Sequence, residues 1–205
     1  MSERSSNSPK QRVARAAANL LYTSQEKEYK QAKLRASQTL GIRVLPSNAL
    51  VANELDNIAD EMEGSARREK LLQMRREALE IMKTLENYHP KLIGSVWRGT
   101  ARRDSDIDIV AFASDLTTVL AQLQCKNFKV AKTEWRSAPK LSRREKSFHI
   151  SLLLSSGNQA EVVVRDLERR NEKEKCEIYG DIVAGLSCRQ LEKVLIEDPF
   201  KKIVP

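Results

Sequence analysis

The sequence has few of the residues on which disulfide-rich, collagen-like and membrane-spanning proteins depend. It holds three cysteines, seven glycines and six prolines in 205 residues. The cysteines are far apart, with no second Cys or His beside any of them, so neither a disulfide framework nor a zinc site is expected. No run approaches the roughly 20 apolar residues that a transmembrane helix needs. These three classes are therefore excluded, and no membrane partner is expected.

The N-terminus is rich in Ser and Arg, as transit peptides are. Glu3 lies within it, however, and the pattern continues into the charged segment 26–33 without a cleavage-like break. We therefore expect a cytoplasmic protein. Residues 1–10 are polar, and we expect them to be flexible.

Charged residues are abundant, with a basic surplus. The chain has 36 Lys and Arg against 28 Asp and Glu, a net charge of +8. Residues 1–43 hold nine basic against three acidic residues, and residues 126–146 hold eight against two, with Phe128 and Trp135 among them. Such segments favour polyanionic partners, and one interpretation is that RNA binds at 10–43 and 126–146. The alternative is a solvated helix face and a solvated hairpin.

Apolar spacing predicts a helical N-terminal region, residues 1–88. One helix is expected over residues 9–40, a second from Pro46 and Ser47 to Gly64, and a third from Ser65 to before Pro90. This region is also a candidate interface for a protein partner or a homodimer.

Residues 89–205 have a different pattern. Short β-rich runs are found at 91–96, 106–113, 128–135, 148–154 and 160–166. A hairpin turn is expected between the last two runs, and Ser187 with Gln190 forms a capping-box pattern before a final helix. The predicted class is α/β: a small mixed or antiparallel sheet with flanking helices, preceded by the helical region.

The stretch 92–112, LIGSVWRGTARRDSDIDIVAF, carries the strongest chemical signal. A strand is expected to deliver Gly94 and Ser95 to a turn that opens a short helix. A glycine lets a phosphate approach the backbone, Ser95 adds a hydroxyl, and helix N-termini favour anions. The pattern is thus typical of a phosphate-binding turn.

Three arginines follow this turn: Arg98, Arg102 and Arg103. Guanidinium groups match phosphate oxygens in bidentate fashion, so these side chains are candidates for neutralising a triphosphate. For Arg102 and Arg103, ordinary surface salt bridges are an equally good interpretation.

Asp106 and Asp108 lie two residues apart in a predicted strand, so their carboxylates share one face. Two such carboxylates repel each other and lose hydration unless a cation sits between them. Mg²⁺, or Mn²⁺ in its place, is the expected ion, because it takes hard oxygen ligands and completes its shell with substrate phosphates. Two such ions would clamp a phosphoryl transfer.

Together, Gly94-Ser95, Arg98-Gly99 and Ser105-Asp106-Ile107-Asp108 resemble the signature of the DNA polymerase beta-like nucleotidyltransferase superfamily. The similarity extends distantly to the catalytic head of archaeal-type CCA-adding enzymes. The resemblance implies a catalytic domain at 89–205, with Gly94 and Ser95 on the β- and γ-phosphates of an NTP and Asp106 and Asp108 on the metal.

This superfamily also uses a third carboxylate on a neighbouring strand, which binds the catalytic metal and activates the acceptor hydroxyl. Glu161 is the candidate, because it is flanked by apolar residues on a predicted strand. Asp166 ranks second, on the opposite face. Two features depart from the family pattern: a Glu where many members carry Asp, and Trp97 where many carry a small residue. Trp97 would stack on a base or fill the core.

The function implied is Mg²⁺-dependent transfer of a nucleoside monophosphate from an NTP to a hydroxyl of RNA, protein or a small molecule, with release of pyrophosphate. The alternative is a non-catalytic nucleotide- or RNA-binding module of the same fold. No role is assigned to His89 or to His149, although the latter could face the site.

Overall fold

The computed structural model describes residues 8–140 and 143–205. They form two compact units. The first runs to Arg67 and includes Lys175–Asp181, and the second comprises Arg68–Glu174 and Ile182–Pro205. The division between the units thus differs from the expected domain boundary at residue 88. Residues 68–88 belong to the second unit because Met74, Ile81 and Leu85 lie fully buried in its core.

The first unit is helical. It contains α1 (Pro9–Tyr22), α2 (Tyr29–Leu40) and the first part of α3 (Asn48–Thr84). Small side chains form much of its core, which lets the helices approach closely: Ala14, Ala17, Ala18, Ala32 and Ala36.

The expectation of one helix over residues 9–40 is wrong. After α1 the chain turns at Ser24, which has φ 56°, and the main-chain N–H groups of Gln25 and Glu26 donate to the carbonyl of Leu20. The segment 23–28 is TSQEKE and offers no apolar side chain to bury. Because a polar segment gains nothing from continuing the buried stripe, it forms the turn between two helices instead.

The predicted helix break at Gly64 is confirmed. Gly64 has φ 56° and ψ −133° inside α3, a backbone conformation that L-residues with a side chain rarely adopt. The helix axis therefore kinks at this residue.

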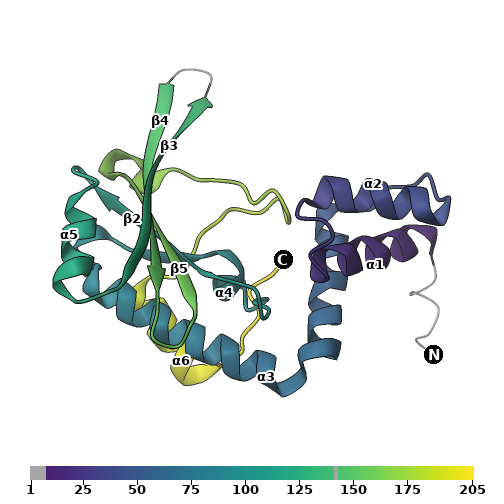
Figure 1. Cartoon of the computed structure of the whole chain (residues 1–205), viewed down its shortest axis with the longest axis horizontal. Helices are drawn as coiled ribbons and strands as arrows, with labels where there is room; N and C mark the ends of the chain where they lie inside the picture. Colours follow the sequence, from purple (N-terminus) through teal and green to yellow (C-terminus); the bar gives the residue numbers. More distant parts are fainter. Residues whose placement is uncertain (1–7, 141–142) are drawn as a thin grey trace. The chain divides into compact units, whose positions relative to one another are not determined.

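In the described part of the second unit, five strands form one mixed sheet (Figure 1). Their spatial order is β1-β2-β5-β4-β3. The strands are β1 (Lys91–Ile93), β2 (Ile107–Ala113), β3 (Val130–Lys140), β4 (Arg143–Leu153) and β5 (Gln159–Asp166). The β2–β5 pair is parallel and the remaining pairs are antiparallel. The predicted mixed sheet is therefore confirmed.

One face of this sheet is covered by helices. Ile107, Ile109 and Val162 belong to one hydrophobic core with residues of α3, of α5 (Thr118–Cys125) and of α6 (Cys188–Glu197). In Figure 1, α3 and α6 run beneath the strands and α5 lies at their left. Since strand side chains alternate between faces, the residues next to these in sequence point to the other face.

The remaining local predictions concern turns and caps. The antiparallel β4–β5 hairpin confirms the turn expected between those strands, where Gly157 N–H donates to Leu154 O. The capping box of Ser187 and Gln190 is also confirmed at the start of α6. The basic segment 126–146 lies in the antiparallel β3–β4 hairpin and the residues that lead into it, with Leu141 outside the described residues.

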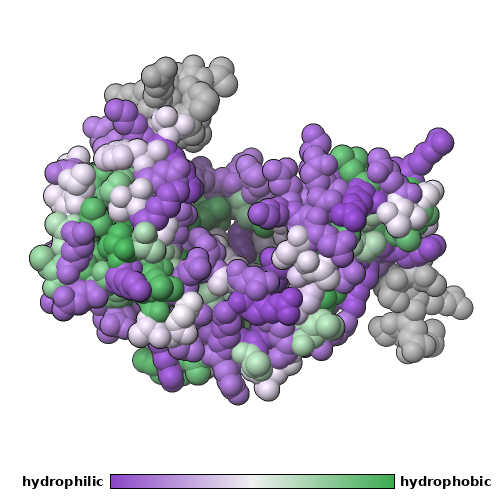
Figure 2. Space-filling view, viewed as in Figure 1, coloured by the Kyte–Doolittle hydropathy of each residue, from purple (hydrophilic) through white to green (hydrophobic). Residues whose placement is uncertain are grey.

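Hydrophilic residues cover most of the surface in Figure 2, and hydrophobic residues gather toward the side where Figure 1 shows α5. Across residues 8–140 and 143–205, no helix combines the length and apolar composition that crossing a bilayer requires.

Candidate active site

The turn at Gly94 has the predicted local structure. β1 ends at Ile93, and the short helix α4 (Gly94–Arg98) begins at the next residue. Gly94 has φ 70°, and a Cβ at this position would lie 2.9 Å from Cγ of Asp108 and overlap one of its carboxylate oxygens. Only glycine therefore fits here, because the backbone passes directly against the Asp108 side chain.

Asp108 and Glu161 lie side by side. β2 and β5 pair in parallel with Asp108 opposite Glu161, and β1 pairs with β2 so that Ile93 is opposite Asp108. Side chains at paired positions point to the same face of a sheet. The fold thus brings together Gly94, directly after β1, Asp108 on β2 and Glu161 on β5.

The Asp108 carboxyl has a strongly perturbed pKa. Burial, the negative charge of Asp106 and the negative charge of Glu161 together raise it from 3.8 to about 7. Asp106 itself is exposed and lies just before β2 begins. The three predicted carboxylates are thus close enough to repel one another, with burial the largest cause of the shift.

Within residues 8–140 and 143–205, no group of three or more His, Cys, Asp or Glu side chains is arranged as a metal-binding cluster. The donor chemistry nevertheless fits a hard divalent cation. Asp108 is half-buried, and burial together with the negative charges of Asp106 and Glu161 raises its pKa to about 7. A divalent cation would relieve that repulsion, so Asp106, Asp108 and Glu161 suit Mg²⁺.

Glu161 has two partners that the sequence did not reveal. Nδ1 of His149, on β4, lies 3.0 Å from Glu161 Oε1, and Nη2 of Arg136, on β3, lies 3.6 Å from the same oxygen. His149 alternates with buried Phe148 and Ile150, which is a signal that it faces the other side of the sheet. Its contact with Glu161 depends on strand order, which the pattern does not give.

Asp166, the second candidate for the third carboxylate, is placed elsewhere. It is the last residue of β5, is exposed, and pairs in register with Ala113 at the far end of β2. Strand alternation puts it on the face opposite to Glu161.

Arg98 is buried and engaged within the fold. Only 5% of its surface is exposed, its Nη1 donates to Ile203 O at 3.2 Å, and its guanidinium lies 4.3 Å from the centre of the Trp97 ring. Trp97 is also buried. These contacts give Arg98 a packing role, and its contact with phosphate stays a prediction. Trp97 fills the core, which is one of the two roles expected for it.

Arg102 and Arg103 lie in the loop between α4 and β2. The Arg102 N–H donates to Ser105 Oγ at 3.0 Å, Arg103 Nε lies 3.5 Å from Asp104 Oδ2, and Lys70 Nζ donates to the Arg103 carbonyl. Arg102 is half-buried and Arg103 is exposed. These contacts shape the loop that leads into Asp106, and the long side chain of Arg103 remains at the surface.

Residues 75–183, more than half of the chain, match the family model described as a nucleotidyltransferase domain. The chain belongs to this family. The match contains Gly94, Asp108 and Glu161, and it confirms the resemblance to the polymerase beta-like nucleotidyltransferases. No curated protein sequence matches the chain significantly.

Three solved structures illustrate the similarity of this chain to known folds. Cid1 poly(U) polymerase is 17% identical over 46% of this chain and 30% of its own, with a TM-score of 0.32. A cytoplasmic RNA terminal U-transferase is 18% identical over 57% and 34%, with a TM-score of 0.34. The GLD-2/RNP-8 complex gives 15% over 51% and 44%, with a TM-score of 0.31. The chain spans less than half the length of these structures.

Arg75 supports α4, the helix that begins at Gly94. The sequence did not indicate this role. Arg75 is fully buried on α3, and burial lowers its pKa to about 10 against the opposing charge of Asp198. Its side chain donates to the main-chain carbonyls of Val96, Trp97, Pro199 and Lys201. Arg75 therefore satisfies carbonyls at the end of α4 and ties the C-terminal segment to it.

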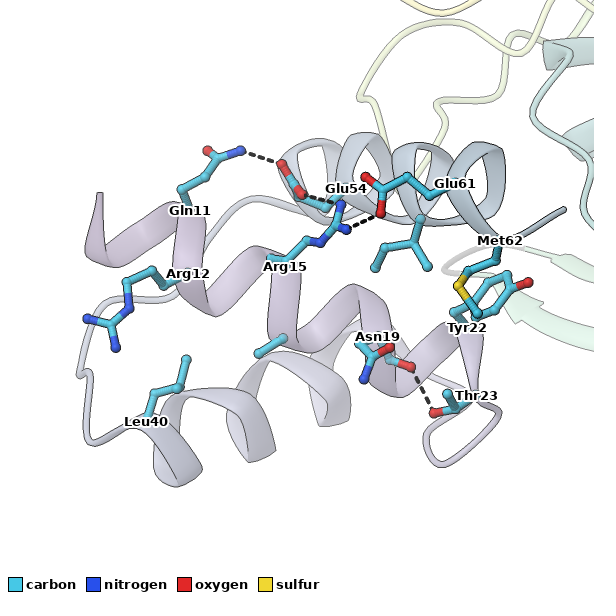
Figure 3. Close-up of a pocket in the computed structure, with 12 residues that line it drawn as sticks. Gln11, Arg12, Arg15, Asn19, Tyr22, Thr23, Leu40, Glu54, Glu61 and Met62 are labelled. Carbon is cyan, nitrogen blue, oxygen red and sulfur yellow. Dashed lines mark hydrogen bonds and ion pairs between the residues drawn. The ribbon is translucent and has the colours of Figure 1, made fainter. Parts of the chain in front are cut away.

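The first unit has a cavity of its own, of about 700 Å³. Figure 3 shows it between α1 and α3: Arg15 bridges Glu54 and Glu61, and Gln11 donates to Glu54. None of its lining residues belongs to the predicted nucleotide or metal site, and those before α3 lie in the basic segment 10–43. Within this cavity the charge of Arg15 is compensated by Glu54 and Glu61.

Proposed function

We propose that this nucleotidyltransferase domain transfers a nucleoside monophosphate from an NTP to a hydroxyl acceptor in a Mg²⁺-dependent reaction. The observation that carries the proposal is the placement of Asp108 and Glu161 in register on β2 and β5, against a glycine whose Cβ would overlap Asp108. A purely structural sheet gains nothing from a carboxylate at this position, because burial, with the negative charges of Asp106 and Glu161 added, raises the pKa of Asp108 to about 7.

In the proposed reaction the acceptor oxygen forms a bond to the α-phosphorus, and the bond from that phosphorus to the leaving pyrophosphate oxygen breaks. Glu161 takes the acceptor's proton. Ser95 and the amides of residues 94 and 95 hold the leaving phosphates, with Arg102 and Arg103 contributing charge. Bound Mg²⁺, or Mn²⁺, would supply Lewis-acid stabilisation of charge on the phosphates. Asp106, Asp108 and Glu161 would hold it.

The acceptor is a hydroxyl of RNA, of a protein or of a small molecule. The basic segments 10–43 and 126–146 support RNA, as they did in the sequence. In the structure, part of this charge is compensated locally, because Lys132 and Arg136 both pair with Glu134. RNA, protein and small molecules are therefore tested in parallel.

The test is incorporation of label from each α-labelled NTP, with Mg²⁺ or Mn²⁺, into cell RNA, cell protein and a small-molecule extract. The wild type is compared with the double variant Asp106→Asn/Asp108→Asn. Asp104→Asn is the matched control, because Asp104 is an exposed carboxylate in the same loop that contacts Arg103. We expect label with the wild type and the control, and none with the double variant.

No label in any mixture, with NTP or RNA binding retained, would replace the proposal by the non-catalytic binding module. In that case, neutralising Asp106 would leave binding intact. RNA binding driven by phosphates would weaken steeply as the salt concentration rises.

A further inference from the structure

We infer that His149 is a positioning residue for Glu161: it holds the Oε1 oxygen, so that Oε2 is directed at the metal and the acceptor hydroxyl. The contacts assigned to Oε2, with the metal and the acceptor hydroxyl, rest on the proposed function. The inference goes beyond that function in assigning separate tasks to the two oxygens of one carboxylate, and a task to a histidine on another strand.

The sheet register sets the geometry. β4 pairs antiparallel with β5, with Ser151 opposite Glu161 and His149 opposite Val163. His149 is thus the diagonal neighbour of Glu161 on the same face, a separation that a long side chain bridges. Nδ1 and Oε1 are 3.0 Å apart, and 11% of the His149 side chain is exposed.

The other ring nitrogen is held as well. Nε2 of His149 lies 2.9 Å from Oγ of Ser147, two residues earlier on β4 and on the same face. A chain of contacts therefore runs from Ser147 through His149 to Glu161. With both nitrogens engaged, the ring has a fixed orientation.

The chemistry of the partners fixes where the imidazole proton lies. An ionised carboxylate only accepts hydrogen bonds, so Nδ1 must carry the proton that is donated to Glu161. The Ser147 hydroxyl suits either state of Nε2, because it donates to a bare nitrogen and accepts from a protonated one. A proton on Nδ1 is therefore what the proposed restraint of Glu161 requires.

The second neighbour of Glu161 contacts the same oxygen. Arg136 Nη2 lies 3.6 Å from Oε1 and 3.2 Å from Glu134 Oε2, and its side chain is 52% exposed. A shared, exposed pair restrains less than a nearly buried hydrogen bond does. Among the described residues, no hydrogen bond or ion pair reaches Oε2 of Glu161. Oε1 is thus held from the protein side, and Oε2 is open to ligands.

Glu161 needs such a restraint because it is a Glu and not an Asp. Glu has one more rotatable bond than Asp, so fixing its carboxylate costs more side-chain entropy. A metal ligand and proton acceptor has to be held within about half an ångström of its working geometry. His149 supplies that restraint for Glu161, which stands where many family members carry the shorter Asp.

The first test reads the imidazole directly and requires no turnover. The chain has two histidines, His89 and His149, so the loss of one signal set in His149→Asn assigns the ¹⁵N ring resonances. We expect His149 with a proton on Nδ1 in the full-length wild type, and a changed Nδ1 resonance in Glu161→Ala. A neutral ring protonated on Nε2 alone, or no change in Glu161→Ala, would overturn the inference.

The second test separates positioning from a structural role. We expect His149→Leu to lower kcat roughly 10- to 100-fold and to weaken Mn²⁺ binding, measured by paramagnetic resonance, to a similar extent. The KM for NTP should change less than about threefold, since the phosphate contacts are elsewhere. His149→Asn places an amide nitrogen near the Nδ1 position and should recover most of kcat, whereas His149→Gln should not.

His89→Asn is the matched control. His89 is exposed with φ 49°, a conformation that Asn tolerates, and it has no part in the proposed site. Thermal unfolding of each variant confirms that it is folded. Wild-type kcat and Mn²⁺ affinity in folded His149→Leu would overturn the inference. If the wild type transfers no nucleotide, the proposed function fails, and the ¹⁵N and Mn²⁺ results still decide whether His149 positions Glu161.

Discussion

Asp108 and Glu161 are register partners on β2 and β5, the parallel strand pair of the sheet. Gly94 lies against the Asp108 carboxylate from the end of β1. A position on a parallel pair is well suited to carboxylates that must hold one geometry, because hydrogen bonds on both sides of each strand restrain the backbone. The predictions below concern the residues that set this geometry.

Gly94→Ala should abolish nucleotidyl transfer and destabilise the protein more than Gly41→Ala does. Gly41 has φ 64° with nothing near its would-be Cβ, so Ala there incurs only backbone strain of about 1 kcal/mol. At Gly94 the same strain adds to an overlap with Asp108. Urea unfolding of both variants measures the difference. Equal losses of stability would show that the Asp108 contact is unimportant.

Asp108→Asn should change how stability depends on pH in the metal-free protein. The folded-state pKa of this carboxyl is raised from 3.8 to about 7. Its contribution to stability is therefore fully present below about pH 4 and is lost as pH rises through 7. In chelator at pH 8, Asp108→Asn should be more stable than the wild type, on the order of 2 kcal/mol, and the gap should shrink toward pH 4.

Thermal unfolding from pH 4 to pH 8 checks this prediction, with Asp104→Asn as the control that should follow the wild type. Added Mg²⁺ should stabilise the wild type at pH 8 and not Asp108→Asn, because the ion replaces the proton between the carboxylates. A wild-type profile that matches Asp108→Asn at every pH would contradict the shifted pKa.

Arg75→Met should destabilise the fold by about 3–5 kcal/mol. The substitution removes the Arg75 hydrogen bonds to the carbonyls of Trp97, Pro199 and Lys201, whereas the Val96 carbonyl still accepts from the Gly99 N–H. Arg76→Met, at an exposed position on the same helix, should change stability by about 0.5 kcal/mol or less. Chemical denaturation midpoints provide the comparison. Similar small losses in both variants would refute the supporting role of Arg75.

Arg98→Ala and Arg102→Ala should have opposite signatures. Arg98 is buried against Trp97 and donates to Ile203 O, so its loss should lower Tm by several degrees. Arg102→Ala should leave Tm nearly unchanged and raise the KM for NTP several-fold, as expected for a phosphate contact in the loop before Asp106. Melting curves and initial rates over a range of NTP concentrations distinguish the two. A raised KM with an unchanged Tm in Arg98→Ala would restore it as a phosphate ligand.

The local chemistry of the site was predictable because its residues are close in sequence. Gly94, Ser95, Asp106 and Asp108 lie within one stretch, and the alternation of polar and apolar residues placed a carboxylate on one face of β2. The same local logic predicted the break at Gly64 and the hairpin before β5. Glycine spacing and strand period express steric limits that act over a few residues.

Local patterns failed where burial by distant residues decided the outcome. The helix expected over 9–40 breaks at Ser24. The sequence also did not indicate that Arg98 lies against Trp97 and donates to the C-terminal segment, and its role as a phosphate ligand stays a prediction. Whether an arginine faces solvent or the core depends on which segments pack over it. The residue type and the neighbouring sequence do not determine that packing.

The sequence alone therefore determined the family, the mixed α/β class, the phosphate-turn pattern and the types of carboxylate present. Only the tertiary structure decided that Glu161 is the register partner of Asp108, and that His149 and Arg136 contact its Oε1 oxygen. The physical reason is that strand order and register arise from the packing of the whole sheet against α3, α5 and α6. A change of one residue in register would move Glu161 to the other face, and the sequence of one strand does not fix its partner.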